Sequence, residues 1–207
     1  MKKILLLLLL AQLLACIGVT AQTRKVGGPC EGCEAIHECP VPFEELKAFV
    51  TMPDATWENR KPLAINGIVY EADGKTPAPG VVIYLYHTDQ DGFYTPGPGA
   101  KGWEKRHGRI RSWVRTNEKG EYKFVTLRPA PYPDRSEPAH IHITVKAPGV
   151  SEYYLDDYVF DDDPLVTPKY RKKSVNRGGS GIISLKDVGN MYKGERNLYL
   201  GRNIPGY

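Results

Sequence analysis

From residue 62 onward, this chain consists mainly of short β-prone runs separated by turn residues. Asp73-Gly74 and Lys119-Gly120 are dipeptides typical of tight turns between strands. No segment shows the sustained period of a long amphipathic helix. This spacing predicts an all-β fold, an antiparallel β-sandwich. The expected strands are residues 63–70, 81–87, 110–116, 122–127, 140–145, 157–160 and 198–200.

The segment before the sandwich has a different character. Residues 22–60 are expected to form a mostly irregular N-terminal arm, with one short helix at 43–49, ahead of a sandwich domain at 61–207. Cys30, Cys33 and Cys39 lie close together in this arm, and two of these three are expected to form a disulfide in an exported chain. A zinc knuckle that also uses His37 is the less favoured alternative, because four crowded ligands leave no room for a core.

The first 21 residues have the pattern of a signal peptide. Lys2 and Lys3 precede a leucine-rich run that is too short for a membrane-spanning helix, and Ala21 ends a small-residue cleavage signal. We therefore expect export to the periplasm or the extracellular space, without a stable membrane span. An alternative is a lipoprotein acylated at Cys16, because residues 13–16 resemble a bacterial lipobox.

The charge balance gives no indication of a polyanionic partner. The full chain has 28 Lys and Arg against 24 Asp and Glu, and removal of Lys2 and Lys3 with the signal leaves a net charge of +2. Nothing in this balance favours binding to nucleic acid or to an anionic membrane. The length that remains suits one domain with a sizeable core.

Two histidines and a tyrosine carry the first chemical signal. His140 and His142 are two residues apart in a predicted strand, so both imidazoles project from the same face. Tyr132 precedes them by eight residues and stands between Pro131 and Pro133, which stiffen its loop. Two neutral nitrogen donors beside a phenol that can ionise predict a site for an oxidised transition metal. The alternatives are the ordinary polar face of a sheet, or zinc or copper on the histidine pair.

A series of sequence blocks extends from residue 66 to residue 165. They include Gly92-Phe93-Tyr94, Pro131-Tyr132-Pro133 and Pro138-Ala139-His140-Ile141-His142. In order and spacing, the blocks resemble those of the intradiol ring-cleavage dioxygenases, the catechol and protocatechuate dioxygenase family. The similarity covers residues 62–207. The blocks are residues 66–69, 80–83, 87–94, 116–124, 129–133, 138–142 and 160–165.

The resemblance implies a mononuclear Fe(III) site with two tyrosinates, two histidines and a hydroxide. The ligands would be Tyr94, Tyr132, His140 and His142. Tyr132 would also be catalytic, as the tyrosinate that leaves the metal when substrate binds. Hard phenolate oxygens match hard ferric iron, and their charge favours the oxidised state. The implied reaction opens a catechol-type ring between its hydroxylated carbons with O2, giving a muconate-type diacid.

Two positions depart from the family pattern. Glu137 stands where the family usually has Arg, and Asp157 stands where it has Gln. Arg135 is expected to take the place of the missing cation and contact the substrate. Arg109 is expected either to bind an anionic or phenolic substrate or to be an ordinary loop residue. The remaining signals, Trp113, His37 and His87, are expected to be structural.

A competing interpretation comes from a different functional class. The sandwich would have the immunoglobulin or transthyretin-like arrangement, and the chain would be a non-catalytic binding module that retains a metal site. Glu137 and Asp157 favour this alternative, whereas the presence of all four predicted ligands favours the enzyme. The expected partners are a small aromatic diol and O2, and a homo-oligomer is compatible with the sequence.

Overall fold

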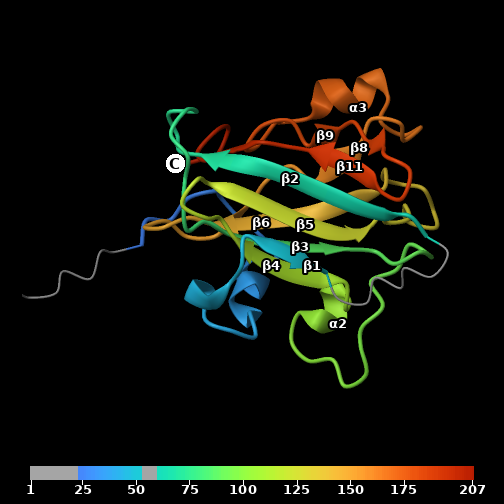
Figure 1. The fold of residues 1–207 in the computed structure, drawn as a ribbon, viewed down its shortest axis with the longest axis horizontal. Coiled ribbons are helices and arrows are strands. Elements are labelled where there is room, and N and C mark those ends of the chain that lie inside the picture. The colour runs from blue at the N-terminus through green and yellow to red at the C-terminus, as the bar shows by residue number, and fades with distance from the viewer. Residues whose placement is uncertain (1–22, 53–59) are drawn as a thin grey trace, which may run out of the picture.

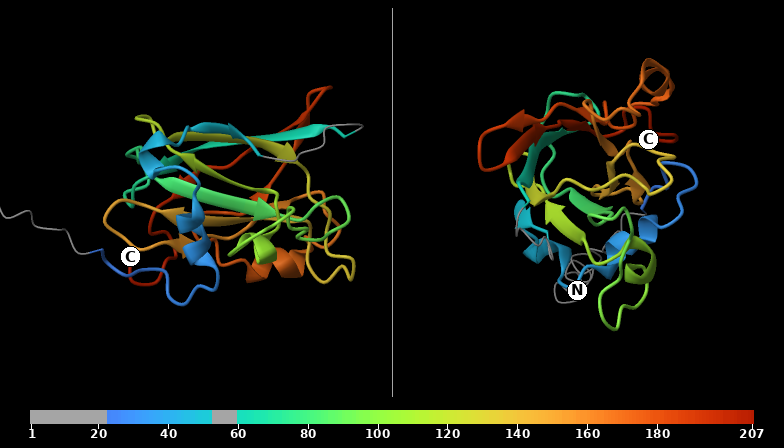
Figure 2. Two further views of the ribbon diagram at one scale, coloured as in Figure 1. Left: turned by 90° about the horizontal axis from the view of Figure 1, so that it is seen from below. Right: turned by 90° about the vertical axis from the view of Figure 1, so that its right-hand side faces the viewer.

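Two β-sheets face each other across the core of this protein (Figures 1 and 2). The computed structural model describes residues 23–52 and 60–207, so the expected signal peptide and Cys16 lie outside the described residues. The first sheet has the order β1-β5-β2-β11-β10, with β12 also paired to β2. Its strands are β1 (Phe49–Thr51), β2 (Pro62–Tyr70), β5 (Glu121–Leu127), β10 (Lys186–Asp187), β11 (Tyr192–Glu195) and β12 (Leu198–Tyr199).

The second sheet has the order β4-β3-β6-β8-β9, and β7 pairs with β6. The expected all-β sandwich is confirmed. Both sheets are mixed rather than purely antiparallel, because β1 runs parallel to β5, β11 and β12 run parallel to β2, and β9 runs parallel to β8. The strands of this sheet are β3 (Val82–His87), β4 (Arg111–Arg115), β6 (His140–Lys146), β7 (Tyr153–Tyr154), β8 (Tyr158–Phe160) and β9 (Ile182–Ile183).

The described helices are short. The expected helix at 43–49 is only a single 3₁₀ turn, η2 (Phe43–Glu45), because Phe49 pairs with Lys123 at the edge of the first sheet. Among the described residues, no helix has the length and apolar composition needed to cross a bilayer. The others are η1 (Cys33–Glu38), α2 (Glu104–His107) and α3 (Pro168–Lys173), which lies beside β8 and β9 (Figure 1).

Strand alternation separates the core from the outer face of the second sheet. Ile141, Ile143 and Val145 of β6 point into the core between the sheets. His140 and His142 alternate with them and therefore lie on the opposite face. The N-terminal arm covers part of this outer face, where η1 and η2 pack with Trp103 against the outward side chains of β3 and β4. These residues form a second apolar cluster of Ala35, Ile36, Cys39, Phe43, Leu46, Val82, Tyr84, Tyr86, Trp103 and Trp113.

The arm contains the expected disulfide, which joins Cys30 to Cys33 and leaves Cys39 as a free cysteine. The zinc knuckle is therefore not formed, since two of its four ligands are bonded to each other. His37 instead lies 3.1 Å from the Glu152 carboxylate.

Two further residues have the structural roles expected from the sequence. The Nε2 of His87 lies 2.6 Å from the Thr126 hydroxyl and so links the two sheets through the core. Trp113 packs against η1 and donates from its indole nitrogen to the Ile36 carbonyl oxygen at 2.8 Å.

Candidate metal centre

The four side chains predicted as metal ligands meet at one point of the fold. The Tyr94 hydroxyl oxygen lies 2.8 Å from that of Tyr132 and 2.7 Å from Nε2 of His142. The Tyr132 hydroxyl oxygen lies 3.2 Å from Nε2 of His140, and the two Nε2 atoms are 3.1 Å apart. The donor atoms thus form a closed ring of two oxygens and two nitrogens, assembled from two loops and one strand.

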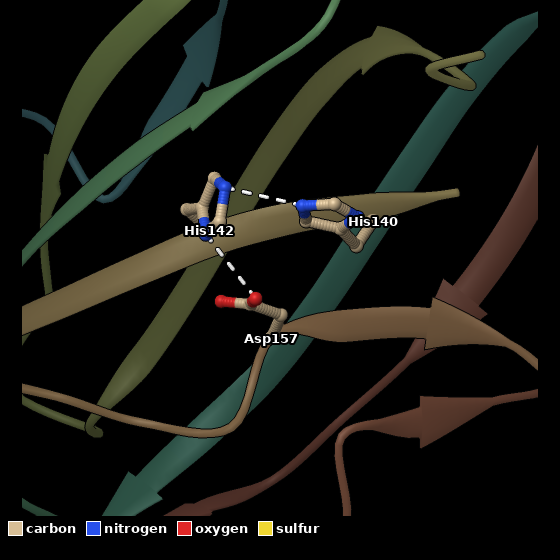
Figure 3. A group of neighbouring side chains, drawn as sticks. All are labelled: His140, His142 and Asp157. Carbon is tan, nitrogen blue, oxygen red and sulfur yellow. Dashed lines mark hydrogen bonds and ion pairs between the residues drawn. The ribbon is translucent and has the colours of Figure 1, made fainter. Parts of the chain in front are cut away.

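The hydrogen bonds of the two imidazoles determine which ring nitrogens face this centre. Nδ1 of His140 lies 2.7 Å from the Pro138 carbonyl oxygen, and Nδ1 of His142 lies 3.1 Å from Oδ2 of Asp157 (Figure 3). Because a carbonyl or carboxylate oxygen can only accept, each Nδ1 carries the proton. Both Nε2 lone pairs therefore point toward the ring of four donor atoms. A histidine that binds a metal commonly has this arrangement, with its other ring nitrogen protonated and hydrogen-bonded.

Asp157 owes its position to the pairing of β6 with β8. His140 pairs with Val159 and Ile141 with Tyr158, so the next step along this antiparallel register places Asp157 opposite His142. Burial opposes ionisation of this carboxyl group, but His142, His140 and Arg196 together outweigh burial and hold the pKa of Asp157 below its usual value. Asp157 therefore remains a carboxylate that orients His142, a role that the sequence did not indicate.

Asp157 could instead be taken as a metal ligand, because it forms a group with His140 and His142 whose potential ligand atoms lie within 4.8 Å of one another. Its carboxylate, however, faces Nδ1 of His142, whereas Nε2 faces the two tyrosines. These nitrogens are on different edges of the imidazole, so an ion at the ring of four donors leaves Asp157 as the hydrogen-bond partner. We consider the ring the better candidate.

The two tyrosines come together because their loops are held in tight turns. The Asp89 carboxylate accepts hydrogen bonds from the backbone of Asp91 and Phe93 and fixes the loop that leads to Tyr94. Gly92 in this loop has φ of 84°, and a Cβ there would collide with the Pro131 carbonyl oxygen. The loop that carries Tyr94 can therefore approach the Tyr132 loop this closely only with glycine at this position.

The protonation of the four side chains suits a bound cation. Burial lowers the pKa of His140, which keeps it neutral and able to donate a lone pair. Burial and the hydrogen bond with Tyr132 raise the pKa of Tyr94 far above its usual value, and burial likewise raises the pKa of Tyr132. Without a cation, both phenols stay protonated, whereas a bound metal ion stabilises phenolates. Two phenolate oxygens and two imidazoles fit a hard, oxidised transition metal.

An aromatic stack supports His142 from the side. Tyr86 pairs with His142 across β3 and β6, and their ring centroids are 4.4 Å apart. The other face of Tyr86 lies on His107 of α2, with a centroid separation of 3.8 Å and nearly parallel rings. Nδ1 of His107 is in turn 2.9 Å from the hydroxyl of Tyr84. Sequence reasoning missed Tyr86. Strand alternation nevertheless places it on the same face as Tyr84, two residues earlier, which is the outer face of the sheet.

A cavity of about 780 Å³ opens beside the centre. His142, Tyr86 and Asp157 line it, and Glu137 lines it from the loop that follows Tyr132. Of the four donor residues, His142 is the one that lines this cavity.

The two predicted catalytic arginines lie outside this cavity wall. Arg135 is exposed in the turn after Tyr132, where its backbone N–H donates to the Tyr132 carbonyl oxygen at 2.8 Å. Arg109 lines a separate cavity of about 230 Å³ together with His87 and Asp89. The roles expected for Arg135 and Arg109 in binding substrate therefore remain predictions.

Comparison with known proteins gives a consistent result. A family model described as dioxygenase matches residues 43–178. Catechol 1,2-dioxygenase of Acinetobacter baylyi is 28% identical over 145 residues, which cover 59% of this chain and 46% of the relative. Chlorocatechol 1,2-dioxygenase of Cupriavidus pinatubonensis is 28% identical over 173 residues, covering 70% and 64%. The chain thus spans about half to just under two thirds of these relatives.

Solved structures show the same fold at lower identity. Catechol 1,2-dioxygenase from Acinetobacter sp. ADP1, inhibited by bound mercury, has a TM-score of 0.55 at 22% identity, covering 75% of this chain and 57% of that one. The dioxygenase domain of a dioxygenase carbohydrate-binding protein fusion from Streptomyces sp. SirexAA-E has a TM-score of 0.54 at 20% identity, covering 75% and 87%.

Proposed function

Because the chain belongs to the intradiol ring-cleavage dioxygenase family, we propose that it is a non-heme Fe(III) enzyme that cleaves a catechol-type ring between the two hydroxylated carbons. The single observation that carries this proposal is the closed ring of donor atoms formed by Tyr94, Tyr132, His140 and His142. A structural sheet face has no need for two half-buried phenols against two imidazoles whose lone pairs converge.

The proposed reaction balances without any further reductant. The bond between the two hydroxylated carbons breaks, both atoms of O2 enter the product, and the diol becomes a muconate-type diacid. When bound at the centre, ferric iron would supply Lewis acidity that makes the electron-rich diol reactive toward dioxygen. The protein would contribute metal binding, substrate orientation and proton positions.

The surrounding residues have separable roles in this proposal. Tyr94, His140 and His142 would hold the metal, with His142 oriented by Asp157. Tyr132 lies on a loop and is less buried than His140, which suits a ligand that is displaced by substrate. Its hydroxyl oxygen would then take a proton from the incoming diol.

The alternative proposal is a binding module without turnover. One observation favours it: the Glu137 side chain lines the cavity beside His142, where a carboxylate would repel a catecholate. Asp157, the other position that departs from the family, no longer supports this alternative, because its carboxylate is engaged with His142.

A spectrum followed by a labelled turnover experiment separates the two. Protein loaded with Fe(III) should show a broad visible tyrosinate-to-iron absorption, and catechol added without oxygen should shift it. Admission of ¹⁸O₂ should then give a diacid carrying both labelled atoms. Protein that stays colourless after iron loading would overturn the ferric site. A band that catechol shifts, without any diacid after oxygen is admitted, would favour the binding module.

A further inference from the structure

The orientation of the His142 imidazole depends on more than its hydrogen bond to Asp157. That bond, from Nδ1 to the carboxylate, fixes one edge of the ring, but the ring can still rock about this edge. His142 also lines the cavity beside the centre, so part of its surface is open. The plane of the imidazole, and with it the direction of the Nε2 lone pair, therefore depends on what packs against the face of the ring.

The side chain that packs there, Tyr86, lies between two imidazoles. Because β3 lies between β4 and β6, Tyr86 has His142 of β6 on one side and the segment leading into β4 on the other. Its ring centroid is 4.4 Å from that of His142 and 3.8 Å from that of His107, with interplanar angles of 24° and 5°. His107 is itself buried. Tyr86 can therefore move away from His142 only if His107 also moves.

The N-terminal arm holds the segment that carries His107. The helix α2 (Glu104–His107) is a single turn, too short to be stable by itself. The Glu38 carboxylate of the arm accepts from the backbone N–H of Trp103 at 2.9 and 3.1 Å, and from Nη1 of Arg111 at 2.9 Å. Trp103 precedes α2 and Arg111 begins β4, so one carboxylate ties the arm to both ends of this segment.

The disulfide loop of the arm rests on the Nε2 edge of His107. Cys30 and Cys33 close this loop around Gly32, which has φ of 83°. A Cβ at Gly32 would lie 3.0 Å from Nε2 of His107, so a larger residue would have to displace the imidazole. The arm therefore contacts the same ring that backs Tyr86.

We propose that His107 is a positioning residue of the metal centre, which acts through Tyr86 to hold the His142 imidazole in place, and that the disulfide loop holds His107. This role rests on the proposed function, since it concerns the same metal site. His107 would not contact the metal or the substrate. A ligand whose ring is free to rock binds a metal less tightly, because its lone pair is no longer held in the productive direction.

Two substitutions of His107 separate its ring from its hydrogen bond. His107→Ala removes the ring behind Tyr86 and should lower the affinity for Fe(III) by roughly three- to tenfold, the strength of one aromatic contact. His107→Phe keeps a ring there and loses the contact with the Tyr84 hydroxyl, so its affinity should stay within about twofold of the wild type. Competition with an iron chelator measures the affinities. The proposal is overturned if His107→Ala binds Fe(III) as the wild type does, or if His107→Phe loses as much as His107→Ala.

Two glycines of the arm give a matched test of the disulfide loop. Gly28 and Gly32 both have positive φ, 71° and 83°, so alanine at either position imposes a left-handed backbone. Only at Gly32 does the added Cβ press on His107, because nothing lies within 4 Å at Gly28. Gly32→Ala should therefore lower the affinity for Fe(III) by about threefold, whereas Gly28→Ala should leave it unchanged. Equal affinities in the two variants would overturn the role of the loop.

Nuclear magnetic resonance of the metal-free protein gives a readout that does not depend on iron. The ring current of Tyr86 should shift the ring protons of His142 upfield in the wild type. His107→Ala should reduce this shift, and His107→Phe should keep it. Wild-type protein that binds no Fe(III) sinks the proposed function, while these shifts still decide whether His107 holds the stack. Protein that turns over catechol, but whose His142 shifts are the same in the wild type and in His107→Ala, sinks the inference alone.

Discussion

Nδ1 of His142 donates a hydrogen bond to Oδ2 of Asp157, with the two atoms 3.1 Å apart. Asp157 follows from the register of β8 on β6, and this contact directs Nε2 of His142 toward the two tyrosines. A carboxylate that accepts from the far nitrogen of a ligand histidine fixes its tautomer and raises its basicity. The position that departs from the family pattern is thus part of the architecture of the centre.

Replacement of Asp157 should weaken metal binding without unfolding the protein. Asp157→Leu removes the acceptor and should lower the affinity for Fe(III) by about 10- to 100-fold. Asp157→Asn keeps an acceptor oxygen but loses the charge, so its loss should be smaller. The matched control is Asp156→Asn, a neighbouring carboxylate that contacts Asn176 instead of His142. Competition with an iron chelator measures the affinities, and equal losses at both positions would contradict the orienting role.

Substitution of Gly92 should separate the two tyrosine-bearing loops. Gly92 and Gly99 both have positive φ, 84° and 73°. Alanine at either position has the cost of a left-handed backbone, about 1–2 kcal/mol. Only at Gly92 does the added Cβ also collide with the Pro131 carbonyl oxygen, because nothing lies within 4 Å at Gly99. Gly92→Ala should therefore lose more stability in urea unfolding and shift or abolish the visible iron band, which Gly99→Ala should leave in place.

Each predicted tyrosine ligand should contribute separately to the visible spectrum. Tyr94→Phe and Tyr132→Phe each remove one phenolate, so each should lower the affinity for Fe(III) by at least about tenfold and change the tyrosinate absorption. Tyr84→Phe is the control, because its hydroxyl contacts His107 rather than the ring of donors. Resonance Raman spectra of the three iron-loaded variants report bound tyrosinate directly. A spectrum left unchanged by either ligand variant would remove that tyrosine from the site.

Acid should destabilise the fold through His87. Burial lowers the pKa of this imidazole to about 4, so the folded protein keeps it neutral where the unfolded chain, with a pKa of about 6.5, already binds a proton. The unfolded state therefore gains protons first, and stability falls as the pH falls from about 6.5 toward 4. Between pH 7 and about pH 4.5 this group should cost about 2 kcal/mol. Urea unfolding at both pH values should show a smaller loss for His87→Gln, and an equal loss would contradict the assignment.

The outward residues of β3 and β6 show what the sequence pattern predicts and what depends on strand pairing. The period of two in a strand is local, so the sequence predicts that His140 and His142 share a face. It equally implies that Tyr84 and Tyr86 share one. Only the register that pairs Tyr86 with His142 places the aromatic ring against the ligand. Strand register depends on the packing of entire faces and on loop geometry, which single-residue patterns do not contain.

The disulfide and the parallel strand pairs show the same difference between what the sequence predicts and what the tertiary structure determines. Three closely spaced cysteines predicted one bridge, and the fold selected Cys30 and Cys33. Among the short strands after residue 180, β9 pairs in parallel with β8, and β11 and β12 pair in parallel with β2, since the connections that lead there from β8 and β2 are long enough to return to the same end of a sheet. A periodicity that identifies a strand says nothing about the direction of its neighbour.

By itself, the sequence determined the β-rich class and which residues of a strand share a face, because these depend on local alternation. It also predicted the four side chains of the candidate metal centre, from short motifs and their resemblance to a family. Tertiary structure alone decided that the hydroxyl oxygens of Tyr94 and Tyr132 lie 2.8 Å apart and that Asp157 supports His142. Each of these depends on contacts between segments far apart in the chain, whose geometry is set by the packing of the two sheets and their loops.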